Sequence, residues 1–158
     1  MTVAFAIEEV ERVARDVRRA AEAYVTSLGK NNPRLAGWCL VVSVVLRNAL
    51  AVAGFSVELV GGRVYHEVGE FVAVTDHFWV AVEVVRTTLW EDRCAFVDCT
   101  ATQLESLGLP GAAVLPPGDA RRRSYDLVLD DVGPDVLCGD DWRHVEAIER
   151  LLGAEEAA

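Results

Sequence analysis

The sequence predicts an α+β fold, in which a buried helix carries a cysteine and packs on an antiparallel β-sheet, with flanking N- and C-terminal helices. Three observations predict it. The first segment has helical periodicity, the second is apolar and too long for one strand, and the next segments alternate in polarity. The 158 residues suit one hydrophobic core, so we expect a single domain over residues 1–158.

Residues 3–28 are predicted to form a long amphipathic helix that ends at Gly29. Its apolar positions follow the helical period: Ala6, Ile7, Val10, Val13, Ala14, Val17, Ala20, Ala21, Tyr24, Val25 and Leu28. Charged residues cover the other face: Glu8, Glu11, Arg12, Arg15, Arg18 and Arg19. This pattern is typical of a surface helix packed on a core.

The second helix, over residues 37–53, is apolar on almost all sides and is expected to be buried. Its many β-branched residues favour a strand, but seventeen residues exceed one ordinary strand, and Gly54 provides a stop. Cys39 stands at its start. A thiol there faces unpaired backbone N–H groups and the positive end of the helix dipole, and both stabilise the reactive thiolate.

Alternating segments predict the sheet. Residues 55–60 form a strand that Gly61 and Gly62 are expected to end, and residues 63–74 continue in strand with a turn near Gly69. Residues 76–85 place alternate side chains on opposite faces, with Phe78, Val80, Val82 and Val84 on one and His77, Trp79, Ala81 and Glu83 on the other. After a hairpin connection at 86–93, residues 94–99 form the returning strand.

The last third contains weaker signals. Thr100 or Thr102 can cap a short helix that runs through Leu107. Residues 108–124 are rich in proline and glycine and are predicted as loop, followed by an edge strand at 125–129. A final helix over residues 142–152 is expected to be capped by Asp140 or Asp141.

Composition excludes several functions. The net charge of −10 argues against nucleic-acid binding, and we interpret the one basic cluster, residues 121–123, as a solvated loop. No segment has the length of a membrane span, and the N-terminus lacks a basic signal region, so we expect a cytoplasmic protein without membrane contact. Its four cysteines are expected to be free thiols. The oligomeric state does not follow from the sequence.

Cys39, His77 and Asp98 have the chemistry of a thiol acyl-transfer site, which needs a nucleophile, a base and a group that orients the base. Cys39 opens the buried helix, His77 opens a strong strand and Asp98 ends the next one. If these strands pair antiparallel, the start of the first lies beside the end of the second. His77 and Asp98 are therefore expected to be neighbours.

Three motifs resemble the transglutaminase-like branch of the papain-like cysteine enzyme superfamily. They are the cysteine at a helix start, the stretch Asp-His-Phe-Trp-Val-Ala-Val, and the stretch Phe-Val-Asp-Cys-Thr-Ala-Thr-Gln-Leu. The resemblance covers about residues 35–105. It implies a helix on an antiparallel sheet, with Cys39 as nucleophile, His77 as base and Asp98 as orienting acid.

The sequence departs from papain-type peptidases six residues before Cys39, where Pro33 stands in place of an oxyanion-binding glutamine. Asn31, Asn32 or the backbone N–H groups at Cys39 can take that role. The pocket candidates are Asn32, Trp38, Trp79 and Gln103. Trp79 either walls the site or packs in the core, and Gln103 is either near Asp98 or purely structural.

Each of these residues also has a structural interpretation. Cys39 can be a small buried hydrophobe, His77 a core histidine, and Asp98 a turn residue that bonds Thr100. A zinc site from His77, Cys39, Cys94 and Cys99 is the rival chemistry, but the spacing fits no closed zinc pattern. Cys94 and Cys99 are also expected to point to opposite faces. We therefore predict no metal and no cofactor, and we interpret His66 and His144 as surface residues without partners.

The sequence thus predicts a thiol enzyme that attacks an amide or thioester carbonyl through a Cys-His-Asp triad. It would act as a peptidase or amidase, or as an acyl or amine transferase, with a peptide or protein substrate. The alternative is a non-catalytic binding or regulatory module with the same fold. A catalytic Cys39 is accessible and reactive, whereas a structural one is inert.

Overall fold

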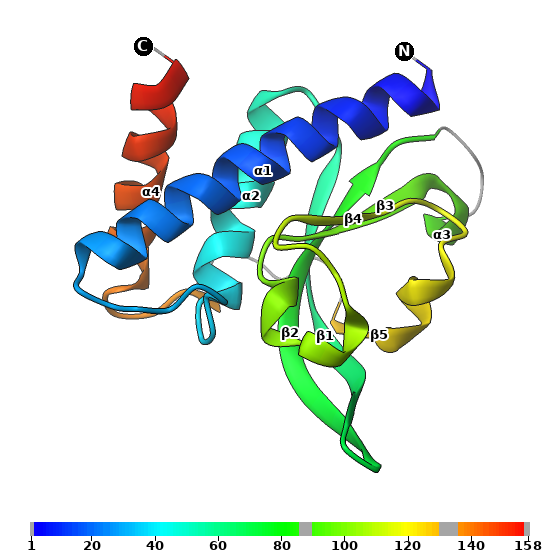
Figure 1. The fold of residues 1–158 in the computed structure, drawn as a ribbon. Helices are drawn as coiled ribbons and strands as arrows, with labels where there is room; N and C mark the ends of the chain where they lie inside the picture. Colours follow the sequence, from blue (N-terminus) through cyan, green and yellow to red (C-terminus); the bar gives the residue numbers. More distant parts are fainter. Residues whose placement is uncertain (1, 86–89, 130–135, 157–158) are drawn as a thin grey trace.

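A computed structural model describes residues 2–85, 90–129 and 136–156 and confirms the α+β class (Figure 1). Four helices are described: α1 Val3–Ser27, α2 Cys39–Val52, α3 Trp90–Arg93 and α4 Asp141–Glu156. The strands are β1 Val57–Val68, β2 Phe71–Glu83, β3 Cys94–Asp98, β4 Ala113–Leu115 and β5 Tyr125–Leu129. They form one antiparallel sheet in the order β4-β3-β2-β1-β5. Short 3₁₀ turns lie at Ala101–Gln103, Glu105–Leu107 and Ala120–Ser124.

The sheet separates two hydrophobic cores. On one face, α1, α2 and α4 pack together against side chains that include Val80, Val82 and Val97. On the other face, residues 101–125 cover side chains that include Trp79 and Ala81. Because side chains alternate along a strand, β2 contributes to both cores, as the sequence predicted for this strand.

The β1–β2 hairpin is longer than its neighbours and projects from the sheet (Figure 1). β5 pairs with β1 only over residues 61–64, and β3 pairs with β2 only over residues 80–83. We call the projecting part, residues 65–76, the arm. Its tip turns at Gly69, which has a positive φ of 61° and lies where the sequence placed a turn.

Gly61 and Gly62 do not end the strand, contrary to the prediction. β1 runs through them, and a Cβ atom on Gly62 would collide with the Trp79 ring and the backbone oxygen of Asp126. Glycine is therefore required at position 62, because neighbouring atoms of the sheet approach it closely. In the sequence alone, a glycine with this role looks the same as one that ends a strand at a turn.

Burial of the whole cysteine-bearing helix is not confirmed. The middle of α2 is enclosed, since Val41 through Leu46 and Leu50 are buried, but the last turn faces solvent and Val52 is 90% exposed. Helix α1 departs from its prediction in the opposite direction, because one of its side chains is more buried than predicted. Arg18, which the sequence placed on the exposed face, is only 7% exposed because hydrogen bonds to neighbouring loops hold its guanidinium.

The C-terminal half contains further differences. β4 lies within the predicted loop, because its three residues are too few to show a periodicity and depend on pairing with β3. β5 is at the sheet edge as predicted, and α4 is longer than predicted at its C-terminal end. Thr100 flanks the first 3₁₀ turn without a side-chain cap. Part of the predicted 86–93 connection lies outside the described residues.

His66 and His144 both have partners, contrary to the prediction. His66 Nε2 is 2.8 Å from Thr75 Oγ1, and His144 Nδ1 is 2.7 Å from the Tyr24 hydroxyl. Partners on other elements give no signal in the local sequence. None of the helices in the described part of the chain has the length and apolar character needed to cross a bilayer.

Candidate functional site

Helix α2 is fixed against β2 at the position where both predicted reactive residues lie. Ser43 donates a hydrogen bond from its hydroxyl to the backbone oxygen of Phe78, at 3.0 Å. Cys39 stands four residues before Ser43 and therefore lies on the same side of the helix, one turn nearer the N-terminus. Phe78 directly follows His77, so this bond brings the start of α2 to the part of β2 that carries the histidine.

Asp98 ends β3 and lies close to His77 through the strand register. Val80 is opposite Val97, so Asp98 falls opposite Trp79, and His77 is two residues further along the same face of β2. His77 Nε2 is 2.8 Å from Asp98 Oδ2. The structure therefore brings these two side chains together, as the antiparallel pairing predicted.

The Asp98 carboxylate is buried and fully hydrogen-bonded. Oδ2 accepts from the Tyr125 hydroxyl at 2.8 Å as well as from His77, and Oδ1 accepts from the Thr100 amide at 2.8 Å and the Thr100 hydroxyl at 3.0 Å. Burial by itself raises the pKa of Asp98, but the charge and hydrogen bond of His77 and the other donors outweigh it, so this pKa is lowered. The carboxylate is thus held ionised.

His77 is 1% exposed and its ring stacks on Trp79, with centroids 6.5 Å apart. Burial lowers the pKa of His77, whereas the charge and hydrogen bond of Asp98 raise it, and the hydrogen bond and charge of Cys39 raise it further. The net result is a pKa of about 10, in the direction that the sequence predicted. His77 is therefore an imidazolium at neutral pH.

The other ring nitrogen of His77 faces Gln103, whose side-chain nitrogen is 3.4 Å from Nδ1. This bond comes from the turn that follows Asp98. Because both nitrogens of an imidazolium donate hydrogen bonds, the amide oxygen of Gln103 suits this position when the ring is charged. Gln103 thus contacts the ring of His77 and can help to hold its orientation.

Cys39 differs from the other three cysteines in its surroundings. It is partly exposed and interacts with His77. Cys94 and Cys99 are buried in different cores, and burial raises the pKa of each thiol. Cys138 is exposed, with its sulfur 3.9 Å from a carboxylate oxygen of Asp141. Only Cys39, among the described cysteines, combines exposure with a cationic neighbour.

The first turn of α2 offers backbone donors beside Cys39. Trp38 is the N-cap residue and makes no side-chain cap, and the first backbone bond of the helix runs from the Val42 amide to the Trp38 oxygen. The amides of Cys39, Leu40 and Val41 are therefore the groups that an ordinary cap would satisfy. They can stabilise negative charge on an oxygen close to the sulfur.

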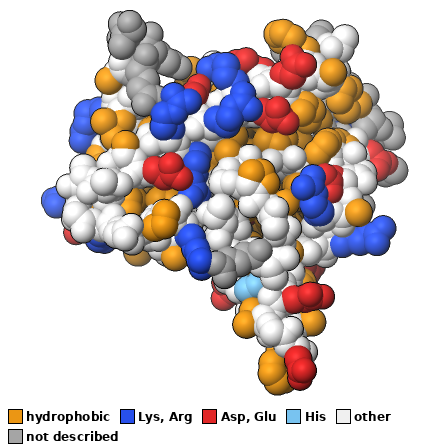
Figure 2. Space-filling view, viewed as in Figure 1, with side chains coloured by type: hydrophobic (Ala, Val, Ile, Leu, Met, Phe, Trp, Pro, Cys, Tyr) orange, Lys and Arg blue, Asp and Glu red, His pale blue; other side chains and the backbone are white. Residues whose placement is uncertain are grey.

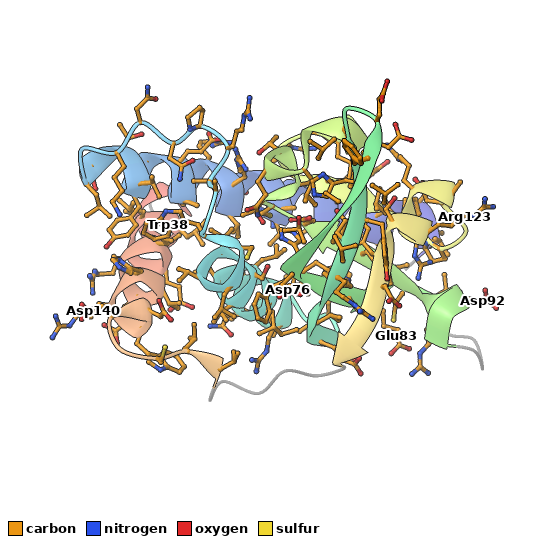
Figure 3. All side chains as sticks on the ribbon, turned by 90° about the horizontal axis from the view of Figure 1, so that it is seen from below. Trp38, Asp76, Glu83, Asp92, Arg123 and Asp140 are labelled. Carbon is orange, nitrogen blue, oxygen red and sulfur yellow. The ribbon has the colours of Figure 1, made fainter. Side chains whose placement is uncertain are left out.

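The side chains of Asn32 and Trp38, which the sequence proposed for the pocket, are engaged elsewhere. Asn32 bonds both the nitrogen and the oxygen of Ala36, each at 3.0 Å, and so closes its own loop. Trp38 packs edge-on against Tyr24 and His144. Trp79 is fully buried beneath His77, so it supports the ring in the second core. Figure 3 labels Trp38 on the segment that leads into α2.

A buried arginine connects the segments that flank the site. Arg18 donates to the backbone oxygen of Cys99 at 2.7 Å and to the hydroxyl of Thr102 at 3.2 Å, and it also bonds the backbone oxygen of Pro33. Cys99 directly follows Asp98, and Pro33 belongs to the loop that leads to α2. Arg18 therefore fixes the two segments that carry Asp98 and Cys39 relative to each other.

Sequence reasoning missed Arg18, Tyr125 and Ser43. Tyr125 is 27 positions from Asp98, and no local pattern links the two residues. Arg18 has the spacing of an exposed helix residue, so only its hydrogen bonds reveal its role. Ser43 lies in an otherwise apolar helix. A single hydroxyl there needs a hydrogen-bond partner, and this is the one sequence signal that could have indicated its role.

No group of three or more histidine, cysteine or acidic side chains in the described residues is arranged to hold a metal. Comparison of the chain with known protein families, with curated proteins and with solved structures finds no match. The function is therefore inferred from the site itself.

Proposed function

We propose that the protein is a thiol acyl-transfer enzyme of the transglutaminase-like type, with Cys39 as nucleophile, His77 as acid and base, and Asp98 as the group that orients and charges His77. The observation that carries the proposal is the buried His77–Asp98 pair, at 2.8 Å, beside a partly exposed cysteine at an uncapped helix start. The motifs of the sequence support the same assignment.

In the first half-reaction, the Cys39 thiolate attacks the carbonyl carbon of an amide or thioester and forms a C–S bond. The carbonyl electrons move to oxygen, where the amides of the first turn of α2 stabilise the negative charge. The charge then returns, the bond to the leaving group breaks, and His77 gives its proton to the leaving amine or thiol. The product is an acyl group on Cys39 and a neutral His77.

In the second half-reaction, neutral His77 takes a proton from water or from an amine, which attacks the acyl carbon. The C–S bond breaks, the thiolate is regenerated and His77 is again charged. Water gives hydrolysis and an amine gives transfer. Asp98 keeps the Nε2 side of His77 occupied throughout, so Nδ1, which Gln103 also approaches at 3.4 Å, is the nitrogen that carries out these proton transfers.

The reactivity of the cysteines tests this proposal. Brief treatment with iodoacetamide at pH 6, followed by peptide mass mapping, should label Cys39 faster than Cys138, although Cys138 is the more exposed thiol. Cys138 is an internal control, because it meets the same reagent without a histidine partner. His77→Ala should slow labelling of Cys39 and leave that of Cys138 unchanged. Faster labelling of Cys138, or no effect of His77→Ala, would reject the triad.

The covalent intermediate gives a second test. p-Nitrophenyl acetate should transfer an acetyl group to Cys39, detectable by mass spectrometry after acid quenching and removable with hydroxylamine. Cys39→Ser should abolish the fast release of p-nitrophenol. An inert Cys39 would instead favour the non-catalytic binding or regulatory module.

A further inference from the structure

The outer edge of β2 is open from the tip of the hairpin to the site. β1 pairs with β2 along residues 71–82, whereas β3 pairs with the opposite edge only over residues 80–83. Among the described residues, the stretch 71–78 therefore has a strand neighbour on one side alone. Such an edge presents backbone N–H and C=O groups that can pair with another chain.

The hydrogen-bond phase identifies which backbone groups point outward. The Glu83 amide bonds the Ser56 oxygen, so odd-numbered residues of β2 bond to β1. The Val84 amide bonds the Arg93 oxygen, so even-numbered residues face the β3 side. Val72, Val74 and Asp76 therefore each present one N–H and one C=O to the open edge. None of the described residues bonds to these groups.

This open edge ends at the nucleophile. The next even residue is Phe78, and its backbone oxygen is already bonded by Ser43 of α2. Cys39 lies one turn beyond Ser43 on the same side of α2. A chain that pairs with residues 72–76 and continues along β2 thus arrives at the start of α2, beside His77. Figure 3 views the molecule from below and labels Asp76 on this part of β2.

The side chains of the arm define the chemistry of that chain. Phe71 is 77%, Val72 68% and Val74 52% exposed, so the arm is apolar as well as open. Residues 64–85 contain no lysine or arginine, the residues that usually protect an exposed edge. The acidic residues Glu67, Glu70 and Asp76 are exposed. Figure 2 shows hydrophobic and acidic side chains over the projecting arm.

We infer that the protein takes its substrate as an extended polypeptide segment, rich in apolar and basic residues, that adds as a strand to the open edge of β2 and presents a carbonyl to Cys39. The inference rests on the proposed function and names its substrate class. Strand addition derives affinity from main-chain bonds, and alternate side chains of the added segment face the apolar surface of the arm. Residues 72 to 78 span about 20 Å, which accommodates about six substrate residues.

Peptide probes of graded length test the inference. Each probe has a central α,β-unsaturated carbonyl that alkylates a thiolate, flanked on both sides by zero, two or four residues of alternating valine and lysine. The rate constant for modification of Cys39 should rise at least about tenfold from the shortest to the longest probe, since each added main-chain bond stabilises the complex. Iodoacetamide, which needs no strand, measures the intrinsic reactivity of Cys39 in every variant.

Val74→Pro removes one outward N–H from the open edge and should abolish most of this gain, with the iodoacetamide rate unchanged. Glu67→Pro is the matched control and is compared with Glu67→Gln, because both variants lose the same acidic charge and only the proline also removes an outward N–H, from the opposite edge of the arm. These two variants should show the same gain as each other, and Val74→Thr, which keeps the N–H, should retain the gain of the wild type. Val72→Pro, nearer the tip, should reduce the rate of the longest probe alone. Circular dichroism checks that each variant is folded.

These experiments distinguish failure of the proposed function from failure of strand addition. If labelling of Cys39 by iodoacetamide does not depend on His77, the proposed function fails. If that dependence holds but rates do not increase with probe length, or Glu67→Pro and Val74→Pro lose equally, strand addition is rejected and the triad stands. A concentration-dependent dimer that Val74→Pro dissociates would also reject it, because a second copy of the chain would then occupy the edge.

Discussion

Replacing Asp98 with asparagine should remove the negative charge that keeps His77 protonated. The carboxylate accepts bonds from His77 and Tyr125 on one oxygen and two bonds from Thr100 on the other. In Asp98→Asn, the amide oxygen keeps both Thr100 bonds only if the NH₂ group faces His77. His77 Nε2 must then accept a hydrogen bond, so its neutral tautomer carries the proton on Nδ1. That tautomer cannot take a proton at Nδ1, the nitrogen that the proposed reaction uses.

The expected change in the charged fraction of His77 follows from its pKa. Burial lowers this pKa, and Asp98 and then Cys39 raise it to about 10, so without the Asp98 charge it should fall well below that value, towards the ordinary value of about 6.5. At pH 8, a pKa of about 10 keeps about 99% of the rings charged, whereas one of about 6.5 leaves about 3% charged. Labelling of Cys39 at pH 6.5 to 7 should then fall at least about tenfold, because the reactive thiolate loses its cationic neighbour.

Histidine ring signals in NMR titrations and the pH profile of Cys39 alkylation measure these two effects in the wild type and in Asp98→Asn. Tyr125→Phe is the matched control, since it removes one donor to the same carboxylate oxygen and keeps the negative charge. It should lower stability by about 1 to 2 kcal/mol and leave the alkylation profile close to that of the wild type. If His77 of Asp98→Asn still titrates near 10, or both profiles coincide, the reasoning about the pair is refuted.

Three further predictions concern stability, each measured by urea denaturation. Because the pKa of His77 is raised in the folded state, its charge stabilises the fold fully below about pH 6.5, and this stabilisation is lost as the pH rises towards 10. The effect is measured in Cys39→Ser, which has no thiol at the site. In this variant the free energy of unfolding should fall by about 1 kcal/mol from pH 7 to 8. Adding His77→Gln should flatten that slope, and an equal slope would contradict the assignment. Arg18→Met should lower the free energy of unfolding by about 3 kcal/mol, because it leaves buried carbonyl oxygens unpaired. Arg19→Met, on the exposed face, is the control and should change it by less than about 0.5 kcal/mol. Equal effects would show that Arg18 does not hold the segments of Cys39 and Asp98 together. Gly62→Ala should cost about 3 kcal/mol through overpacking, and a change below about 0.5 kcal/mol would mean that the close approach at this residue is not tight.

The local chemistry of the chain was sufficient to predict the main elements and the proximity of His77 and Asp98. The period-two alternation of β2 assigned Val80 and Trp79 to opposite faces, and the structure places them in separate cores. The neighbouring positions of His77 and Asp98 followed from antiparallel pairing alone. These features depend on nearest neighbours in sequence or on one rule of strand pairing, so a single sequence contains them.

Tertiary structure decided how the site is supported and where it is open. Asn32 has a side chain suited to the pocket but bonds within its own loop, while Arg18 has the spacing of a surface residue but fixes two distant segments. The open edge of β2 exists because β3 is much shorter than β1, a difference in length that no motif records. In each case the outcome depends on which distant backbone groups come within hydrogen-bonding reach, and those distances are set only when the whole sheet and its helices have packed.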